Sequence, residues 1–130
     1  NRFRGLKMAL YEHVFISRQD LSTSQAEELI SQYSKILADN GGEVVGHEYW
    51  GLRTMAYKIK KNRKGHYSMI MSDSPPAAAQ EMERLMKINE DIIRIMTIKV
   101  AKHQEGPSTM AKTKTKSDDI SNEVSEGRLG

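Results

Sequence analysis

WGLRTMAYKIKKNRKGHY, residues 50–67, is the central stretch of this chain. Residues that favour strands lead into a polar, cation-rich segment that ends in glycine, a pattern typical of a hairpin. We expect one long strand over residues 43–60, a turn over 61–65 and a returning strand over 66–72. Gly65 is free to take the positive φ that such a turn uses. The hairpin decides the fold, because it places two antiparallel strands in the middle of the chain.

The apolar residues of the long strand change sides part-way along it. Trp50 and Leu52 fall on even positions, whereas Met55, Tyr57 and Ile59 fall on odd ones. Side chains alternate strictly in a regular strand, so the change predicts a bulge or a sharp twist near residues 53–54. Since Trp50 follows the parity of Leu52, we favour packing of its indole over stacking on a base.

A helical segment flanks the hairpin on each side. In residues 22–39 apolar residues recur at spacings of three and four. Ser22, Thr23 and Ser24 all offer N-cap oxygens, and Ser24 with Glu27 has capping-box spacing. The glycines of 40–42 end that helix, since glycine accepts the left-handed backbone of a C-cap. Ser74-Pro75 begins a second helix, with a cap-competent serine before the proline. Residues 89–91 close it.

Two more strands complete the pattern. Residues 8–17 are apolar on both sides, as in a strand at the middle of a sheet, and residues 92–102 form the last strand. The order strand–helix–strand–strand–helix–strand predicts an α+β, ferredoxin-like split βαβ sandwich with a four-stranded antiparallel sheet. Right-handed crossovers place both helices on one face of the sheet. The other face is left without a helix, so we expect a partner to bind there or at the hairpin.

Length and composition divide the chain into three parts. Its 130 residues suit a single domain over residues 8–103, after a short extension over 1–7. Residues 104–130 lack apolar periodicity and are predicted to be a disordered tail. The formal net charge is +3, and residues 1–110 hold the surplus, with 16 Lys or Arg against 13 Asp or Glu. The folded part therefore carries the positive charge.

Several functional classes find no support in the residues. The chain has no cysteine, and no apolar run is long enough to cross a bilayer. Its four histidines are scattered, and no glycine-rich phosphate loop follows a strand. We therefore expect no enzyme activity, no metal or cofactor, no small-molecule substrate and no membrane contact.

Nucleic-acid binding is the chemistry that the central stretch favours. It holds six Lys or Arg and no carboxylate, and aromatic rings stand among these cations. Cations hold phosphates, and flat rings stack on bases. A solvated hairpin whose lysines only keep a sheet edge soluble is the plainer alternative. Two further alternatives remain open. A stand-alone single-strand RNA-binding module needs exposed aromatics such as Tyr11, Phe15 and Tyr67, and an acylphosphatase-like domain needs an anion-cradling loop at 18–20.

Three blocks carry a resemblance to a known family. YEHVFI at 11–16, YWGLRTMAYKIKKNRKGHY at 49–67 and MKINEDIIRIMTIKV at 86–100 together resemble the bacterial small-subunit ribosomal protein six family. The resemblance covers about residues 8–102. It implies a ferredoxin-like structural protein of the cytoplasmic small ribosomal subunit. Such a protein binds the central domain of small-subunit ribosomal RNA together with ribosomal protein eighteen. With the composition of the hairpin, it gives these expected RNA-binding residues: Arg53, Tyr57, Lys58, Lys60, Lys61, Arg63, Lys64, His66 and Arg94.

Overall fold

The computed structural model describes residues 5–102 and confirms the expected order of elements. The elements are β1 (Ala9–Arg18), α1 (Thr23–Asp39), β2 (Glu43–Ile59), β3 (Asn62–Ser74), α2 (Pro76–Lys87) and β4 (Ile92–Val100). The tail predicted over residues 104–130 lies outside the described residues, as do residues 1–4 of the predicted extension.

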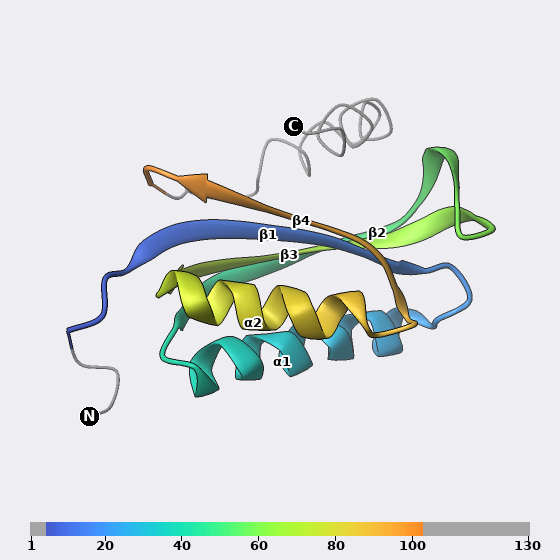
Figure 1. Ribbon diagram of the computed structural model, residues 1–130. Coiled ribbons are helices and arrows are strands. Elements are labelled where there is room, and N and C mark those ends of the chain that lie inside the picture. The colour runs from blue at the N-terminus through green and yellow to red at the C-terminus, as the bar shows by residue number, and fades with distance from the viewer. Residues whose placement is uncertain (1–4, 103–130) are drawn as a thin grey trace.

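The four strands form one antiparallel sheet in the order β2-β3-β1-β4, which leaves β2 and β4 at the edges. Both helices lie against the same face of the sheet (Figure 1). β1 sits in the middle, where Phe15 lies opposite Ser68 on β3 and Ile95 on β4. The ferredoxin-like prediction and the central position of the first strand are therefore confirmed.

The main core lies between the helices and the sheet. Phe15 of β1 and Tyr33 of α1 meet edge to face there, with their ring centroids 6.2 Å apart. Ile70 of β3 and Met82 of α2 are fully buried beside them. Burial of these side chains from four elements holds both helices on the sheet, because apolar surface removed from water stabilises the fold.

Helix α1 has Ser22 as its N-cap, one of the three predicted N-cap residues. The Oγ of Ser22 accepts from the backbone N–H of Gln25 at 3.0 Å, and the N–H of Ser22 donates to Oε1 of Gln25 at 2.8 Å. Ser22 has the extended backbone that an N-cap needs, whereas Ser24 is already helical. Ser22 as a cap is therefore confirmed, whereas the capping box joins Ser22 to Gln25 and not Ser24 to Glu27. At the other end Gly41 has φ +93°, as a C-cap glycine should.

Helix α2 starts one residue later than expected. Its N-cap is Pro75, which offers no side-chain hydrogen bond, and Pro76 occupies the first turn. Ser74 ends β3 and does not cap the helix. The fixed φ of proline suits the first turn, and its missing N–H would have had no helical partner there.

A second apolar cluster lies on the opposite side of the sheet, near the hairpin. It joins Ile16, Trp50, Met55, Tyr67, Met69 and Ile93. Trp50 is buried in it, so the packing interpretation of the indole is confirmed, and its Nε1–H donates to Oε1 of Glu48 at 2.6 Å. Leu52 does not share that environment, because it is largely exposed. The prediction for Trp50 was therefore right, but its reason, that Trp50 and Leu52 share one face of the strand, was wrong.

The change of sides in β2 arises from two irregularities that flank the predicted position. The register shifts between Tyr49 and Gly51, where Gly51 has φ +95°. It shifts again after Thr54, and pairing with β3 resumes only at Ile59. Four residues of β2 therefore face a single residue of β3 at the second shift. The extra residues bend the strand, which lets Met55 and Ile59 pack on the second cluster.

The hairpin turn differs from the prediction in both place and residues. It is made by Lys60 and Lys61, with φ +49° and +70°, between the paired residues Ile59 and Asn62. Gly65 is a buried residue of β3 without a positive φ. A Cβ on Gly65 would lie 2.3 Å from Cγ2 of Ile16. The glycine is needed for close packing between strands and not for the turn.

Candidate nucleic-acid interface

The end of the hairpin gathers five cations on one projecting segment. We call residues 55–64 the hairpin tip. It extends beyond the layer of helices, at the end of the sheet where the chain passes from β1 into α1 (Figure 1). Its cations are all exposed: Lys58, Lys60, Lys61, Arg63 and Lys64. None of the ion pairs found within residues 5–102 involves them.

The backbone of the tip is strained at the two lysines that form its turn. Positive φ at both central residues is the geometry of a type I′ turn, which favours Asn-Gly because a Cβ is crowded there. Lys60 and Lys61 adopt it nonetheless. Asn62 supports the turn, since its Nδ2–H donates to the carbonyls of Ile59 at 3.3 Å and Lys60 at 3.0 Å. Two ammonium groups are thus held at the point of the chain that extends farthest along the hairpin.

The remaining expected RNA-binding residues lie around the tip in different settings. Tyr57 is 56% exposed and lies with Lys58 in the wide bulge of β2. Arg53 is half-buried at the base, and its Nε–H donates to the carbonyl of Trp50 at 3.0 Å. Arg94 is half-buried on β4, opposite Ile16. Tyr57 and Lys58 therefore belong with the tip, whereas Arg94 lies on the far edge strand of the sheet.

His66 does not have the exposure that an RNA contact requires. It is 2% exposed, and both ring nitrogens have protein partners. Its Nε2 lies 2.7 Å from the carbonyl oxygen of Leu21 and donates to it, and its Nδ1 accepts from the hydroxyl of Tyr49 at 2.7 Å. Placing this histidine among the RNA-binding residues was wrong, because its sequence neighbourhood is cationic but its side chain points into the domain.

The aromatic residues of the central strands do not form a stacking platform. Tyr11 and Phe15 are buried, and Tyr67 is 1% exposed within the second cluster. Bases need open ring faces for stacking. A stand-alone single-strand RNA-binding module of the kind weighed from the sequence is therefore not supported.

The loop after β1 is also unlike an anion cradle. The guanidinium of Arg18 bonds to Asp91 at 2.7 Å and to Asp20. The hydrogen bond to Asp91, with the negative charge of both carboxylates, raises the pKa of Arg18. Two acids at this loop would repel a bound anion. This arrangement disfavours the acylphosphatase-like alternative.

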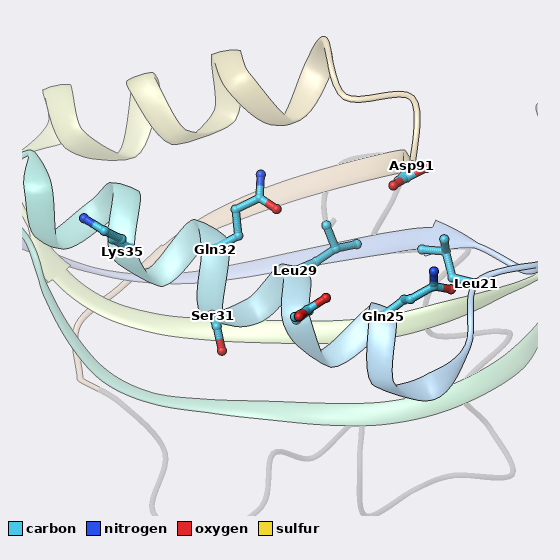
Figure 2. Close-up of a pocket in the computed structure, with 8 residues that line it drawn as sticks. Leu21, Gln25, Leu29, Ser31, Gln32, Lys35 and Asp91 are labelled. Atoms are coloured by element: carbon cyan, nitrogen blue, oxygen red, sulfur yellow. The ribbon is translucent and has the colours of Figure 1, made fainter.

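A hollow along α1 carries no catalytic arrangement. It has a volume of about 540 Å³ and is open to solvent. Figure 2 shows its lining, in which Leu21 and Gln25 lie at the same end as Asp91 and Lys35 lies toward the other end of α1. Across residues 5–102 no three His, Asp or Glu side chains gather as a metal site would need. Neither helix in that range has the length and apolar character needed to cross a bilayer.

His13 illustrates why scattered histidines carried no signal. It is buried in the central strand, with Nδ1 3.0 Å from Oγ1 of Thr97 and Nε2 2.8 Å from Oγ of Ser72. It is a hydrogen-bonded core histidine and not a metal ligand.

The sequence interpretation gave no role to Gln19, which bonds to Asn62 and Lys64 of the tip, or to Asn62, which also bonds within the turn. Polar side chains in loops follow no period, so periodicity gives no signal for them. The position of Asn62 directly after two lysines was the one available cue, since asparagine commonly bonds to the backbone of a turn.

Comparison with known proteins gives a consistent result. The family model described as "Ribosomal protein S6" matches residues 10–99. The chain is similar to the small ribosomal subunit protein bS6 of Cereibacter sphaeroides, with 68% identity over 101 residues, 78% of this chain and 76% of that protein. It is 58% identical over 111 residues to the bS6 protein of Ruegeria sp., covering 85% of this chain and 95% of that protein. Among solved structures, it is similar to 30S ribosomal protein S6 from Thermotoga maritima, with a TM-score of 0.68 and 29% identity. That match covers 72% of this chain and 89% of the other.

Proposed function

Because the chain belongs to the ribosomal protein S6 family, we propose that it binds small-subunit ribosomal RNA through its hairpin tip. Its place is the small ribosomal subunit, where its role is structural and not enzymatic. The proposed contacts are those of the tip, Tyr57, Lys58, Lys60, Lys61, Arg63 and Lys64, flanked by Arg53 and Arg94. His66 is left out, because it is buried.

One observation carries the proposal: the exposed cations of the tip have no ion-pair partner within residues 5–102. Cations that neutralise phosphates release the counterions condensed on the RNA, and this release drives binding. Such contacts fix the position of the protein without reading bases. The strained turn supports the same conclusion, since unfavourable backbone geometry persists where function requires the side chains.

A salt titration tests the phosphate contacts. The variant Lys60→Gln/Lys61→Gln/Arg63→Gln/Lys64→Gln removes four charges and keeps unbranched side chains at the two positive-φ positions. We expect weaker binding to small-subunit ribosomal RNA. The slope of log K against log salt should flatten by roughly 0.7–0.9 for each phosphate that the protein no longer neutralises.

A matched variant separates this effect from loss of net charge. Lys35→Gln/Arg84→Gln/Lys87→Gln/Lys99→Gln also removes four exposed cations, from the two helices and the outer part of β4. Its slope should stay close to that of the unaltered protein. A hairpin variant whose slope equals that of this control would refute the proposed phosphate contacts.

The proposal includes ribosomal protein eighteen as a protein partner on the open face, the side of the sheet without a helix. Support comes from apolar residues that remain half-buried on that face, where they continue outward from the second cluster: Leu10, Val14, Met71, Met96, Ile98 and Val100. Apolar residues grouped on a face are typical of protein contacts. A partner there would leave the hairpin tip accessible to RNA.

A further inference from the structure

We propose that Gln19 and Asn62 form a brace that holds the hairpin tip in its binding position. The inference rests on the proposed RNA-binding function of the tip, and it assigns a positioning role to two uncharged residues. Neither residue needs to touch the RNA. Each residue instead fixes the orientation of the tip, and therefore the direction in which its cations point.

The brace consists of two hydrogen bonds between the β1–α1 loop and the start of β3. The backbone N–H of Gln19 donates to Oδ1 of Asn62 at 2.9 Å. The backbone N–H of Lys64 donates to Oε1 of Gln19 at 3.0 Å. Asn62 uses its other side-chain atom, Nδ2, to bond to the carbonyls of Ile59 and Lys60. One side chain therefore ties the turn to the loop, and through the loop to the domain.

The loop itself is fixed on both sides, so it can serve as an anchor. The backbone N–H of Arg18 donates to the carbonyl of Asp91 at 2.9 Å, and the Arg18 guanidinium bonds to the Asp91 side chain. At the other end of the loop, the carbonyl of Leu21 accepts from the buried His66. The bonds at Gln19 thus connect the tip to a segment that β4 and the core hold in place.

The position of the brace explains its importance. β1 ends at the pair Arg18–Gly65, and beyond that pair β3 has β2 as its one neighbouring strand. Pairing with β2 is then interrupted between Thr54 and Ile59. A two-stranded hairpin is marginally stable by itself, so the tip needs support where the sheet ends. A fixed tip loses less conformational freedom when it binds, and this raises affinity.

The test removes the brace without changing any charge. Gln19→Met deletes the acceptor for the Lys64 amide at similar side-chain volume, and Asn62→Ala deletes the other link. We expect Gln19→Met to weaken RNA binding by about threefold to tenfold, the range of one net hydrogen bond. Asn62→Ala should weaken it by more, because it also removes the bonds from Nδ2 to the carbonyls of Ile59 and Lys60. The salt slope should stay unchanged, because every cation remains. The double variant should lose less than the product of the two single effects, since either deletion opens the same brace.

Amide hydrogen exchange reports on the brace independently of RNA. In free protein, the Lys64 amide should exchange faster in Gln19→Met. In Gln19→Glu it should stay protected, because a carboxylate oxygen still accepts the bond. Two controls share the residue types but lie elsewhere. Gln32→Met alters an exposed glutamine of α1, and Asn40→Ala removes the bond from Nδ2 of Asn40 to the carbonyl of Ile36 at the end of α1. Both controls should leave RNA affinity and Lys64 exchange unchanged.

The outcomes separate the brace from the proposed function. Normal RNA affinity in Gln19→Met, despite rapid exchange at Lys64, would overturn the brace and leave RNA binding by the tip intact. A flattened salt slope in that variant would also overturn it, because the phosphate contacts themselves would then have changed. Absence of salt-dependent binding in the unaltered protein would instead contradict the proposed function.

Discussion

Lys60 and Lys61 lower the stability of the fold, because their backbone is strained, but they place two cations at the end of the hairpin. Both have left-handed backbone geometry, which costs a residue with a Cβ about 1–2 kcal/mol. A turn of Asn-Gly would avoid most of that cost. Since the residues present are lysines, and both are exposed, their charge at the end of the hairpin is the property that the strained turn delivers.

The variant Lys60→Asn/Lys61→Gly is therefore expected to fold more stably and to bind RNA less tightly. Relief of the strained turn should raise the free energy of unfolding by about 1 kcal/mol, measured by denaturant titration. Loss of two cations should lower affinity and flatten the salt slope. Lys60→Gln/Lys61→Gln separates the two effects, because it removes the charge without relieving the backbone. Equal stability of the two variants would contradict the claim of strain.

At the scale of elements, the hairpin shows what a sequence pattern can and cannot predict. The six elements and their order followed from periodicity, because burial of one face imposes a period of two on strands and 3.6 on helices. The positions of the bulges and the turn did not follow. Gly51 and the pair Lys60–Lys61 carry those features. Trp50 and Met55 beside the bulges pack on the second cluster, and Asn62 bonds across the turn; these interactions depend on tertiary structure that the local pattern does not encode.

The same limit applies to the candidate site. Cation-rich sequence predicted the tip correctly as a group of exposed charges, because lysine and arginine are rarely buried without a partner. His66 was misplaced, because its burial depends on Leu21 and Tyr49 from other elements. Gln19 and Asn62 were not found at all, since they meet across 43 positions of sequence.

Gly65 gives a prediction at this scale. Gly65→Ala should destabilise the fold by about 1–3 kcal/mol, because the new Cβ would lie 2.3 Å from Cγ2 of Ile16 and the strands would have to move apart. Thermal unfolding measures the change. In an Ile16→Leu background, which lacks the Cγ2 branch, the same substitution should cost less. If glycine served the turn instead, the cost would be the same in both backgrounds.

Across the whole molecule, the two faces of the sheet differ in what covers them. The helices and the main core hold one side closed. On the other side the second cluster supports the base of the hairpin, and the rest of the face stays half-buried. The cations of the tip lie beyond this cluster and the apolar residues of β4 lie beside it. One small domain can therefore present a charged hairpin tip to RNA and an apolar face to a protein, with Arg94 of β4 between the two.

This separation predicts that the protein partner can be lost while RNA binding persists. Met96 is half-buried on β4, opposite Val14, on the open face. Met96→Lys would force a charge into the proposed interface, and burying an unpaired charge is strongly unfavourable. We expect at least a tenfold loss of affinity for ribosomal protein eighteen, measured by calorimetry. RNA binding by the isolated protein should not weaken, because no cation of the tip is removed.

The matched control is Ile88→Lys, which adds the same charge at an exposed apolar residue that follows α2. It should leave partner affinity unchanged, and both variants should alter the free energy of unfolding by no more than about 0.5–1 kcal/mol. Equal affinity of both variants for the partner would exclude the open face as its binding surface. Loss of RNA binding in Met96→Lys, but not in Ile88→Lys, would mean that RNA covers the open face. That result would contradict separate surfaces for RNA and for the protein partner. Since β4 is an edge strand and the tip extends from β2 and β3, the present architecture favours separate effects.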